Sequence, residues 1–478
     1  MKRKLALFLV VLMTAFTVLG ASGCSLSDNG ERYVVSVEQS TDDNGNGVIR
    51  INYSDGTYTN VAAKDGKDGE DGKDVTIQEV YAEYKKQYGE ISFSDFLKAY
   101  LTLNADNTAI INDCLRSSVK LYTEFIETAY ENTFWNYRSY PKNAMYTGSG
   151  VIYSIDGNYT YILTNYHVVY SSSADKLNGG NFAKNVYCYL YGSEGSPERS
   201  SSTDSNGLYS YTGGAYGINC ELIGGSINCD IAVLRARTED ILKINPDATA
   251  VSVADTYHVG ETAIAIGNPE DGGISVTEGI ISVDNEFITL QIDNTTRRYR
   301  SIRIDTALYS GNSGGGLFNV NGELIGITNA GNQEDQNINY AIPLDIVTGV
   351  VDNLISSYKT SGAVAKINRV TLGVSVSSSE SRYRYDEKSG YGSIEEKVTV
   401  ESVVSESIAA KMGVKAGDVI LSLSINGESY TISRYFNISD IIYRINSGDK
   451  ISITVERDGG TVECNQYTVL SSDMSTID

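Results

Sequence analysis

The sequence has few of the residues that characterise several large protein classes. Only 5 of its 478 residues are proline, and only His167 and His258 are histidine. So few prolines exclude a proline-rich scaffold, and two histidines exclude a histidine-rich metal site. Lysine and arginine number 38 against 60 aspartate and glutamate residues, which gives a formal net charge of -22. A protein that binds the phosphates of a nucleic acid needs a basic surface, so this acidic chain is expected to have no nucleic acid partner.

Cysteine is also scarce. The chain has 6 cysteines and no C-x-x-C pair, which excludes the usual zinc and thioredoxin-type motifs. Cys220 and Cys229 could pair across a hairpin, but two unpaired, small apolar side chains are the better interpretation. We therefore expect neither a metal nor another cofactor.

No apolar run is long enough to span a membrane, which takes about 20 residues. Residues 1–23 are typical of an export signal, because three basic residues precede a short apolar run and then small residues. Residues 21–24 resemble the lipobox of bacterial lipoproteins, in which the cysteine is lipidated and becomes the new first residue. The resemblance implies an extracytoplasmic lipoprotein anchored in the bacterial cell membrane through Cys24. An ordinary secretory signal with a chance cysteine is the alternative.

The next hundred residues predict a small extension. Residues 24–74 are polar and form a tether, within which residues 34–37 and 48–53 alternate like the strands of a hairpin. Their link matches half of a calcium loop, but Tyr53 stands where the closing glutamate belongs, so an Asn-Gly turn is favoured. Residues 75–108 have helical spacing and predict a short helical segment.

The rest of the chain predicts two domains. Residues 109–358 contain many short β-like runs separated by glycine, asparagine and aspartate, a pattern typical of an all-β barrel or sandwich. A helix is predicted at residues 344–358, followed by a linker at residues 359–365. Residues 366–470 have the length of a further small domain.

Three short segments carry side chains suited to acyl transfer. His167 ends an apolar run, Asp230 directly precedes another, and Ser313 lies in the glycine-rich turn at residues 311–316. A serine hydroxyl is a weak nucleophile and needs a base to take its proton. Imidazole can accept that proton and later donate it to the leaving amine. A carboxylate fixes the imidazole tautomer, so the three residue types together suit peptide hydrolysis.

The chain order of these residues separates the possible folds. Residues 311–315 also match the G-x-S-x-G motif of α/β-hydrolases, but in those enzymes the histidine follows the serine, and none follows Ser313. The subtilisin order needs an aspartate at a strand end before His167. Asp113 and Asp156 are available there, but Asp156 lies in a predicted turn. The order histidine, aspartate, serine is that of the chymotrypsin fold.

Five motifs in register resemble the HtrA (Deg) family of serine proteases. They are GSGVI at 148–152, LTNYHVV at 163–169, DIAVL at 230–234, AIGNP at 265–269 and GNSGG at 311–315. The resemblance covers roughly residues 109–470. It implies a mostly β fold, in which a chymotrypsin-like double β-barrel protease domain is followed by a PDZ domain. The hairpin and helical segment then form a small N-terminal extension.

The resemblance also implies site residues. Matched by position, they are the catalytic residues His167, Asp230 and Ser313, the oxyanion-hole residues Gly311, Asn312 and Ser313, and the substrate-binding residues Asn329, Ala330 and Gly331. The family favours small aliphatic residues in its specificity pocket. No acidic residue matches the pocket floor, so we expect no preference for lysine or arginine.

The C-terminal unit resembles a single PDZ domain. Leu372, Gly373 and Val374 match the loop that holds a peptide carboxylate while the peptide adds a strand to the sheet. The resemblance implies an endopeptidase that degrades unfolded or misfolded proteins and assembles as a homotrimer or a multiple of one. A peptide-binding or chaperone protein with an idle triad is the alternative.

Overall fold

The computed structural model describes residues 107–133, 136–292, 295–331, 337–387 and 390–477, together with short stretches of the first hundred residues. The chain forms two compact units, Met1–Tyr100 and Leu101–Asp478, and each is described by itself. The predicted export signal, Cys24 and residues 66–74 lie outside the described residues. In the described part of the chain, no helix combines the length and the apolar character needed to cross a bilayer.

The first unit contains a small antiparallel sheet. Its strands are β1 (Val34–Thr41), β2 (Gly47–Tyr53) and β3 (Tyr58–Ala62), in that spatial order. The two strands of the predicted hairpin are therefore present, whereas the third strand was not predicted. Of the predicted helical segment, Tyr81, Lys85 and Lys86 are helical, and most of the others lie outside the described residues.

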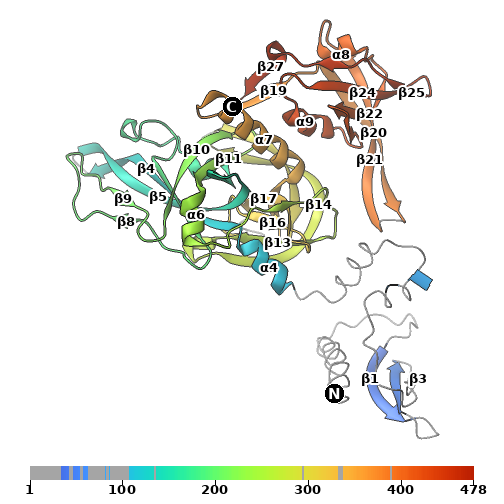
Figure 1. The fold of residues 1–478 in the computed structure, drawn as a ribbon, viewed down its shortest axis with the longest axis horizontal. Coiled ribbons are helices and arrows are strands. Elements are labelled where there is room, and N and C mark those ends of the chain that lie inside the picture. Colours follow the sequence, from blue (N-terminus) through green and yellow to red (C-terminus); the bar gives the residue numbers. More distant parts are fainter. Residues whose placement is uncertain are drawn as a thin grey trace. The chain divides into compact units, whose positions relative to one another are not determined.

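The second unit begins with a closed barrel (Figure 1). A helix, α4 (Thr108–Leu115), precedes its first strand at the point where the sequence predicted the start of the β-rich region. In spatial order the strands are β10 (Ile218–Ser226), β11 (Ile231–Arg237), β6 (Tyr159–Thr164), β5 (Asn136–Ile155), β4 (Ser118–Thr133) and β7 (Asn185–Leu190). Smaller elements of this domain are α5 (Tyr166–Val169), α6 (Thr238–Ile244), β8 (Glu198–Arg199) and β9 (Tyr211–Thr212).

A second ring of six strands follows. Its strands are β17 (Glu323–Gly331), β16 (Gly316–Phe318), β13 (Thr262–Gly267), β14 (Ser275–Ile292), β15 (Thr295–Ile304) and β18 (Asn339–Pro343). The ring closes because β18 also pairs with β17, and β12 (Ser252–Val253) adds to β17 from outside. The mostly β, double-barrel prediction is thereby confirmed.

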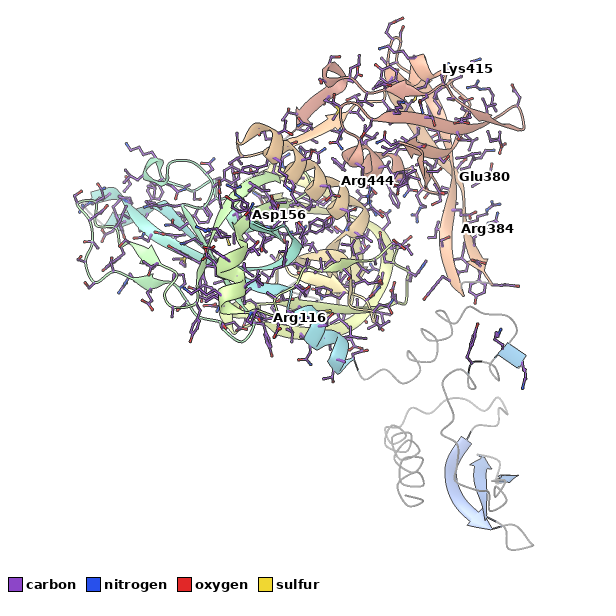
Figure 2. The ribbon with its side chains drawn as sticks, in the orientation of Figure 1. Arg116, Asp156, Glu380, Arg384, Lys415 and Arg444 are labelled. Carbon is purple, nitrogen blue, oxygen red and sulfur yellow. The ribbon has the colours of Figure 1, made fainter. Side chains whose placement is uncertain are left out.

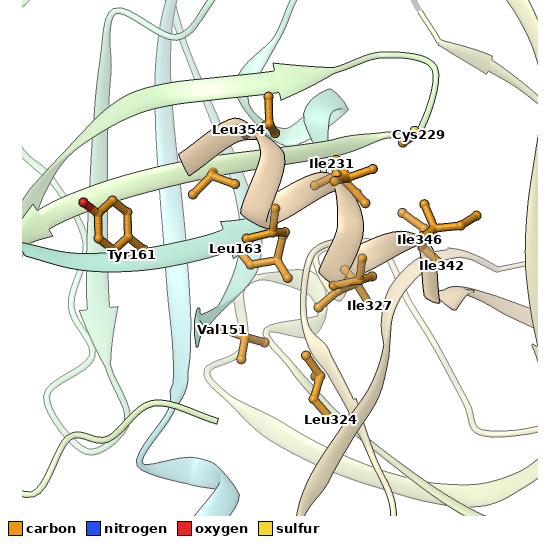
Figure 3. Packing of buried hydrophobic residues seen from close by; sticks show 14 of the residues in the cluster. Val151, Tyr161, Leu163, Cys229, Ile231, Leu324, Ile327, Ile342, Ile346 and Leu354 are labelled. Carbon is orange, nitrogen blue, oxygen red and sulfur yellow. The ribbon is translucent and has the colours of Figure 1, made fainter. Parts of the chain in front are cut away.

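The two barrels share a hydrophobic core. Strands β6 and β11 are buried along nearly their whole length because both of their faces are covered. Ile162 and Leu234 fill the first barrel, while Leu163, Ile231 and Ile327 belong to the cluster between the barrels (Figure 3). This double burial fixes the barrels against one another along the surface where the candidate site lies.

Helix α7 (Leu344–Ser361) covers the same core and extends three residues beyond the helix predicted at residues 344–358. It ends at Gly362, which has a left-handed φ of 68°. The sequence suggested a linker at residues 359–365, but the residues after the helix are hydrogen-bonded to the first barrel. The Ala365 amide donates to the Ile223 carbonyl at 2.7 Å, and its carbonyl accepts from the Gly225 amide at 3.2 Å. The connection thus continues along the edge of β10.

The C-terminal domain has its own sheet and its own apolar core. Its strands are β20 (Val374–Asp386), β21 (Tyr391–Val403), β22 (Val419–Ile425), β24 (Lys450–Arg457) and β25 (Gly460–Glu463), with β23 (Glu428–Thr431) on β22 and β26 (Tyr467–Thr468) on β24. Two short helices are α8 (Ile408–Met412) and α9 (Asn437–Ile441). Strand β27 (Met474–Ile477), beyond the predicted boundary at residue 470, pairs with β19 (Ile367–Val370).

A buried charge joins the C-terminal domain to the second barrel. The Arg300 guanidinium, with a side chain only 4% exposed, lies 2.6 Å from the Asp440 carboxylate of α9 and 3.4 Å from the half-exposed Asp345 carboxylate of α7. It also lies over the Phe436 ring, 4.4 Å from the ring centroid. A charge taken out of water needs such partners, so this contact specifies how the domain packs. The Arg444 guanidinium (Figure 2) bonds Thr348 of α7 nearby.

We expect Asp440→Asn to lower the free energy of unfolding by about 3 kcal/mol, because it leaves Arg300 short of its buried partner. Urea denaturation should be followed at pH 8, since burial raises the pKa of Asp440 to about 7 and the carboxylate is ionised there. Asp345→Asn is the matched control, with an expected loss below about 1 kcal/mol because its carboxylate is 43% exposed. Equal losses in the two variants would contradict the argument.

Candidate active site

The structure brings His167 and Asp230 into direct contact. Asp230 lies just before β11, and its side chain is fully buried. One carboxylate oxygen accepts from the His167 backbone amide at 3.0 Å, and the other lies 2.8 Å from the His167 Nδ1. A carboxylate in this position keeps the proton on Nδ1 and leaves Nε2 as an acceptor.

The backbone of Asp230 is held in an uncommon conformation. Its φ is 52°, in the left-handed region that few non-glycine residues adopt. Its carbonyl accepts from the Tyr166 amide at 3.2 Å and from the buried Asn165 side chain at 2.9 Å. Sequence analysis assigned no role to Asn165, although it lies in the same motif as His167. These bonds hold the strained aspartate beneath the imidazole.

The charge of Asp230 sets the protonation of His167. Burial disfavours the charged imidazolium, but the Asp230 carboxylate and its hydrogen bond outweigh that effect, so the pKa of His167 is raised from its ordinary 6.5. The side chain is still 33% exposed on its other side. His167 is therefore a stronger base than a free imidazole, and it is open to a bound molecule.

The loop that carries Ser313 approaches the first barrel very closely. Gly314 has a φ of +86°, and a Cβ there would lie 2.2 Å from the Thr164 hydroxyl. The Ser149 amide donates to the Ser313 carbonyl at 2.9 Å. The glycine is needed both for the turn and for the approach, and it brings Ser313 beside the segment that carries His167.

Two amides of this loop are free to bind a ligand. The Asn312 amide donates to the Tyr309 carbonyl, and the Gly314 amide donates to the Thr328 carbonyl. Among the described residues, the amides of Gly311 and Ser313 have no hydrogen-bond partner. Of the three residues predicted for an oxyanion hole, these two retain available donors.

Ser149 and Asn268 hold the Gly311 peptide in place. The buried Ser149 hydroxyl donates to the Gly311 carbonyl at 2.7 Å and accepts from the Asn268 amide at 2.8 Å. A Cβ on Gly311, whose φ is +99°, would lie 2.2 Å from the Asn268 carbonyl. Both residues lie in motifs that the sequence singled out, but only the fold shows that they orient this peptide.

The Ser313 hydroxyl does not contact His167 in this structure. It donates to the Asn329 carbonyl at 3.2 Å. Within the described residues, no hydrogen bond joins Ser313 to the imidazole. A change of the Ser313 χ1 rotamer is the smallest movement that could redirect the hydroxyl.

A cleft of about 400 Å³ opens beside these groups. Its lining residues are His167, Tyr170, Ser171, Ser172, Leu290, Gln291, Ile292 and Asn329. The Asn329 side chain is only 5% exposed, and neither its oxygen nor its nitrogen has a hydrogen-bond partner among the described residues. A buried amide without partners is costly, so it is poised for a ligand in the cleft. Ala330 and Gly331 follow it on β17, paired with Tyr340 and Asn339.

The predicted carboxylate loop of the C-terminal domain lies at the start of an edge strand. Leu372 is buried, Gly373 has a left-handed φ of +77°, and Val374 begins β20. In the described part of the chain, β20 pairs only with β21, so its other edge is open. Strands β20 and β21 pair as far as Asp386 and Tyr391, and Figure 2 shows Glu380 and Arg384 on β20.

The ring of the second histidine packs on an aromatic side chain. His258 is half-buried and its ring stacks on Tyr391, with 4.1 Å between centroids. Burial lowers the pKa of His258. No group of three histidine, cysteine, aspartate or glutamate side chains in the described part of the chain is arranged to hold a metal ion.

Comparison with known families matches the two domains. The model of the trypsin-like peptidase domain matches residues 148–327, and that of the PDZ domain matches residues 370–466. Serine protease Do-like HtrB of Bacillus subtilis is 29% identical over 397 residues, covering 81% of this chain and 76% of that protein. Serine protease Do-like HtrA of Lactococcus lactis is 28% identical over 322 residues, covering 65% and 68%. Periplasmic serine endoprotease DegP of Salmonella typhimurium is 31% identical over 342 residues, covering 70% and 60%.

Proposed function

We propose that His167, Asp230 and Ser313 are the catalytic triad of this serine endopeptidase, which is similar to proteases of the HtrA type. The observation that carries this proposal is the pair of 2.8 and 3.0 Å contacts between His167 and the buried Asp230 carboxylate. No other histidine of the chain pairs with a buried carboxylate among the described residues. The proposed substrates are misfolded or unfolded proteins outside the cytoplasm.

The proposed reaction begins when the Ser313 hydroxyl turns from the Asn329 carbonyl toward the imidazole. His167 Nε2 takes the hydroxyl proton as the serine oxygen attacks the scissile carbonyl carbon, and the Asp230 carboxylate stabilises the resulting imidazolium. The free amides of Gly311 and Ser313 donate to the oxyanion that develops. His167 then gives its proton to the leaving amine, and water completes hydrolysis of the acyl-enzyme by the same steps in reverse.

Substrate is proposed to bind along β17 at Asn329, Ala330 and Gly331, with the unpartnered Asn329 amide donating to and accepting from it. Leu290 and Ile292 make part of the cleft wall apolar, and no carboxylate is among the described residues that line the cleft. This composition favours small aliphatic side chains over lysine or arginine. Cleavage-site mapping by mass spectrometry on an unfolded protein measures the preference.

Ser313→Ala should reduce casein hydrolysis by about 10⁶-fold, because the hydroxyl is the proposed nucleophile. The same change should abolish labelling by a fluorophosphonate. Circular dichroism and the thermal unfolding midpoint should stay nearly unchanged, since the side chain makes a single, long hydrogen bond of 3.2 Å. Ser310→Ala, three residues earlier in the same loop, is the matched control and should keep its activity. Casein hydrolysis by Ser313→Ala at the wild-type rate would refute the assignment.

The rate should depend on pH through His167. The imidazole acts as a base only when neutral, and its pKa is raised above 6.5 by Asp230. We therefore expect kcat/KM for a peptide substrate to fall as the pH drops through an apparent pKa above 6.5. Asp230→Asn should lower kcat about 10⁴-fold by disfavouring the required tautomer. A wild-type profile that is flat between pH 5 and pH 9 would argue against His167 as the base.

The PDZ domain is proposed to bind peptide C-termini. The amides around Leu372, Gly373 and Val374 would hold the carboxylate while the peptide pairs with the open edge of β20. A peptide with a free carboxylate should therefore bind at least tenfold more tightly than the same peptide amidated at its C-terminus. Fluorescence anisotropy measures both affinities, and equal values would exclude carboxylate recognition.

The proposed location is the outer face of a bacterial membrane, with lipid attached at Cys24. Cys24→Ser should move the protein from the membrane fraction to the soluble fraction when cells are fractionated. Membrane retention of that variant would exclude the lipid anchor. We also infer a homotrimer or a multiple of one, which light scattering of the purified protein measures.

One observation favours a second candidate function, a peptide-binding protein with an idle triad. The Ser313 hydroxyl donates to Asn329 rather than to His167. Fluorophosphonate labelling with and without a C-terminal peptide separates three cases. Labelling in both supports a competent triad, labelling only with peptide indicates activation by the PDZ domain, and labelling in neither indicates the idle protein.

A further inference from the structure

A buried lysine of the first barrel is paired with a turn of the second. Lys120 of β4 has a side chain only 7% exposed, and its ammonium lies 2.8 Å from the Asp271 carboxylate. The Tyr122 hydroxyl, two residues along the same strand, donates to that carboxylate, with 2.8 and 3.0 Å to its two oxygens. The Lys120 ammonium also lies over the Tyr122 ring, 4.8 Å from its centroid. These three residues are called the clamp below.

The lysine keeps its charge because the aspartate is there. A buried ammonium is costly unless a carboxylate pairs with it, and among the described residues no second carboxylate forms an ion pair with Lys120. Burial favours the neutral amine, but the hydrogen bonds with Asp271 and Tyr122 outweigh that effect and raise the pKa of Lys120 from its ordinary 10.5. The carboxylate is therefore held to a fixed, charged partner in the wall of the first barrel.

The turn that ends at Asp271 has an uncommon backbone. Asp271 is the last residue of the 3₁₀ turn η3 (Pro269–Asp271), which follows β13. Glu270 has a φ of 51° and Asp271 a φ of 61°, both in the left-handed region that few non-glycine residues adopt. Two such residues in succession persist only where the surroundings fix them. The clamp fixes the second one through its side chain.

The same turn contacts the peptide unit that carries the Gly311 amide. The Glu270 amide donates to the Ser310 carbonyl at 2.7 Å. That carbonyl and the Gly311 N–H belong to one peptide unit, and because the unit is planar and trans they point in opposite directions. The bond from Glu270 therefore sets the direction of the Gly311 N–H, which has no partner among the described residues.

We propose that Lys120 is a positioning residue for the oxyanion hole. It holds Asp271, the turn then holds the Ser310 carbonyl, and the Gly311 N–H is thereby aimed at the oxyanion of the reaction. This inference rests on the proposed catalytic function. Lys120 itself contacts neither Ser313 nor His167 in this structure.

The register of the first barrel supports this role. Lys120 of β4 lies directly opposite Ser149 of β5. The Ser149 hydroxyl donates to the Gly311 carbonyl, which belongs to the next peptide unit of the loop. Both peptide units that flank the Gly311 Cα are thus held from two paired residues of one strand pair, one directly and one through Asp271. The first barrel fixes the direction of the amide although the amide belongs to the second.

Loss of the clamp should affect the chemical steps more than substrate binding. The Gly311 N–H is needed only where negative charge develops on the carbonyl oxygen, so its misalignment lowers kcat and leaves KM nearly unchanged. Removing an oxyanion-hole donor outright costs about 10²–10³-fold in kcat. The clamp acts through a turn, so its loss should cost less.

Lys120→Met removes the charge and keeps an unbranched apolar side chain. We expect kcat for a peptide amide to fall about 10- to 100-fold, with KM within about twofold of the wild-type value. A peptide aldehyde, whose adduct with Ser313 places an oxygen in the hole, should lose affinity by the same factor as kcat/KM. The apparent pKa of the rate profile should not move, because His167 and Asp230 are untouched. A wild-type kcat in this variant would overturn the proposal.

Tyr122→Phe has a matched control in the same aromatic cluster. Tyr187 is also buried there, but its hydroxyl donates to the Tyr211 carbonyl at 2.9 Å and not to the turn. Tyr122→Phe should lower kcat severalfold, whereas Tyr187→Phe should keep the wild-type value. Equal kcat values in the two variants would contradict the clamp.

Asp271→Asn separates positioning from stability. Asparagine tolerates the left-handed backbone, and the Asp271 side chain is 44% exposed, so the change disturbs no packing. It leaves the buried ammonium without its carboxylate, so both the thermal unfolding midpoint and kcat should fall. Adding Lys120→Met should restore the midpoint but not kcat. Recovery of both together would show a structural role only and would overturn the proposal. If Lys120→Met fails to fold, the kcat and aldehyde affinity of Asp271→Asn decide the matter.

Failure of the clamp differs from failure of the proposed function. A wild-type protein that hydrolyses the peptide, together with full kcat in Lys120→Met and Asp271→Asn, would refute the clamp alone. A wild-type protein that neither hydrolyses the peptide nor reacts with a fluorophosphonate would refute both.

Discussion

The close approach of the two barrels at Gly314 is the constraint on which the candidate site depends. His167 and Asp230 belong to the first barrel, whereas Ser313 precedes β16 of the second. These groups can meet only if the glycine loop passes within contact distance of Thr164 and Ser149. The apolar core shared by the barrels supplies the attraction that holds this approach, and the glycine removes the side chain that would prevent it.

Hydrogen bonds orient the site residues that the apolar core brings close together. The Ser149 hydroxyl of the first barrel donates to the Gly311 carbonyl. The Asp230 carbonyl accepts hydrogen bonds from the Asn165 side chain and the Tyr166 amide. These contacts join buried groups. Asn329 lines the cleft, and neither its side-chain oxygen nor its side-chain nitrogen has a partner within the described residues. A buried amide without partners that faces a cleft is suited to binding a ligand there.

The C-terminal domain is packed against the same two-barrel body. Residues after α7 continue along β10, and Arg300 of β15 lies between carboxylates of α7 and α9. The open edge of β20 remains uncovered in the described part of the chain. Peptide recognition and hydrolysis are therefore proposed for separate surfaces joined through buried contacts.

The sequence by itself determined the residue types of the site, their order along the chain and the class of fold. The run after Asp230 is continuously apolar because both of its faces are buried, and the stripe of α7 repeats with the period of a helix; such local patterns are visible without coordinates. Tertiary structure alone decided that Ser149 orients the Gly311 peptide and that the Ser313 hydroxyl faces Asn329. These contacts join residues on different strands, so they depend on strand register and barrel closure. Neither is encoded in the spacing of residues within a single segment.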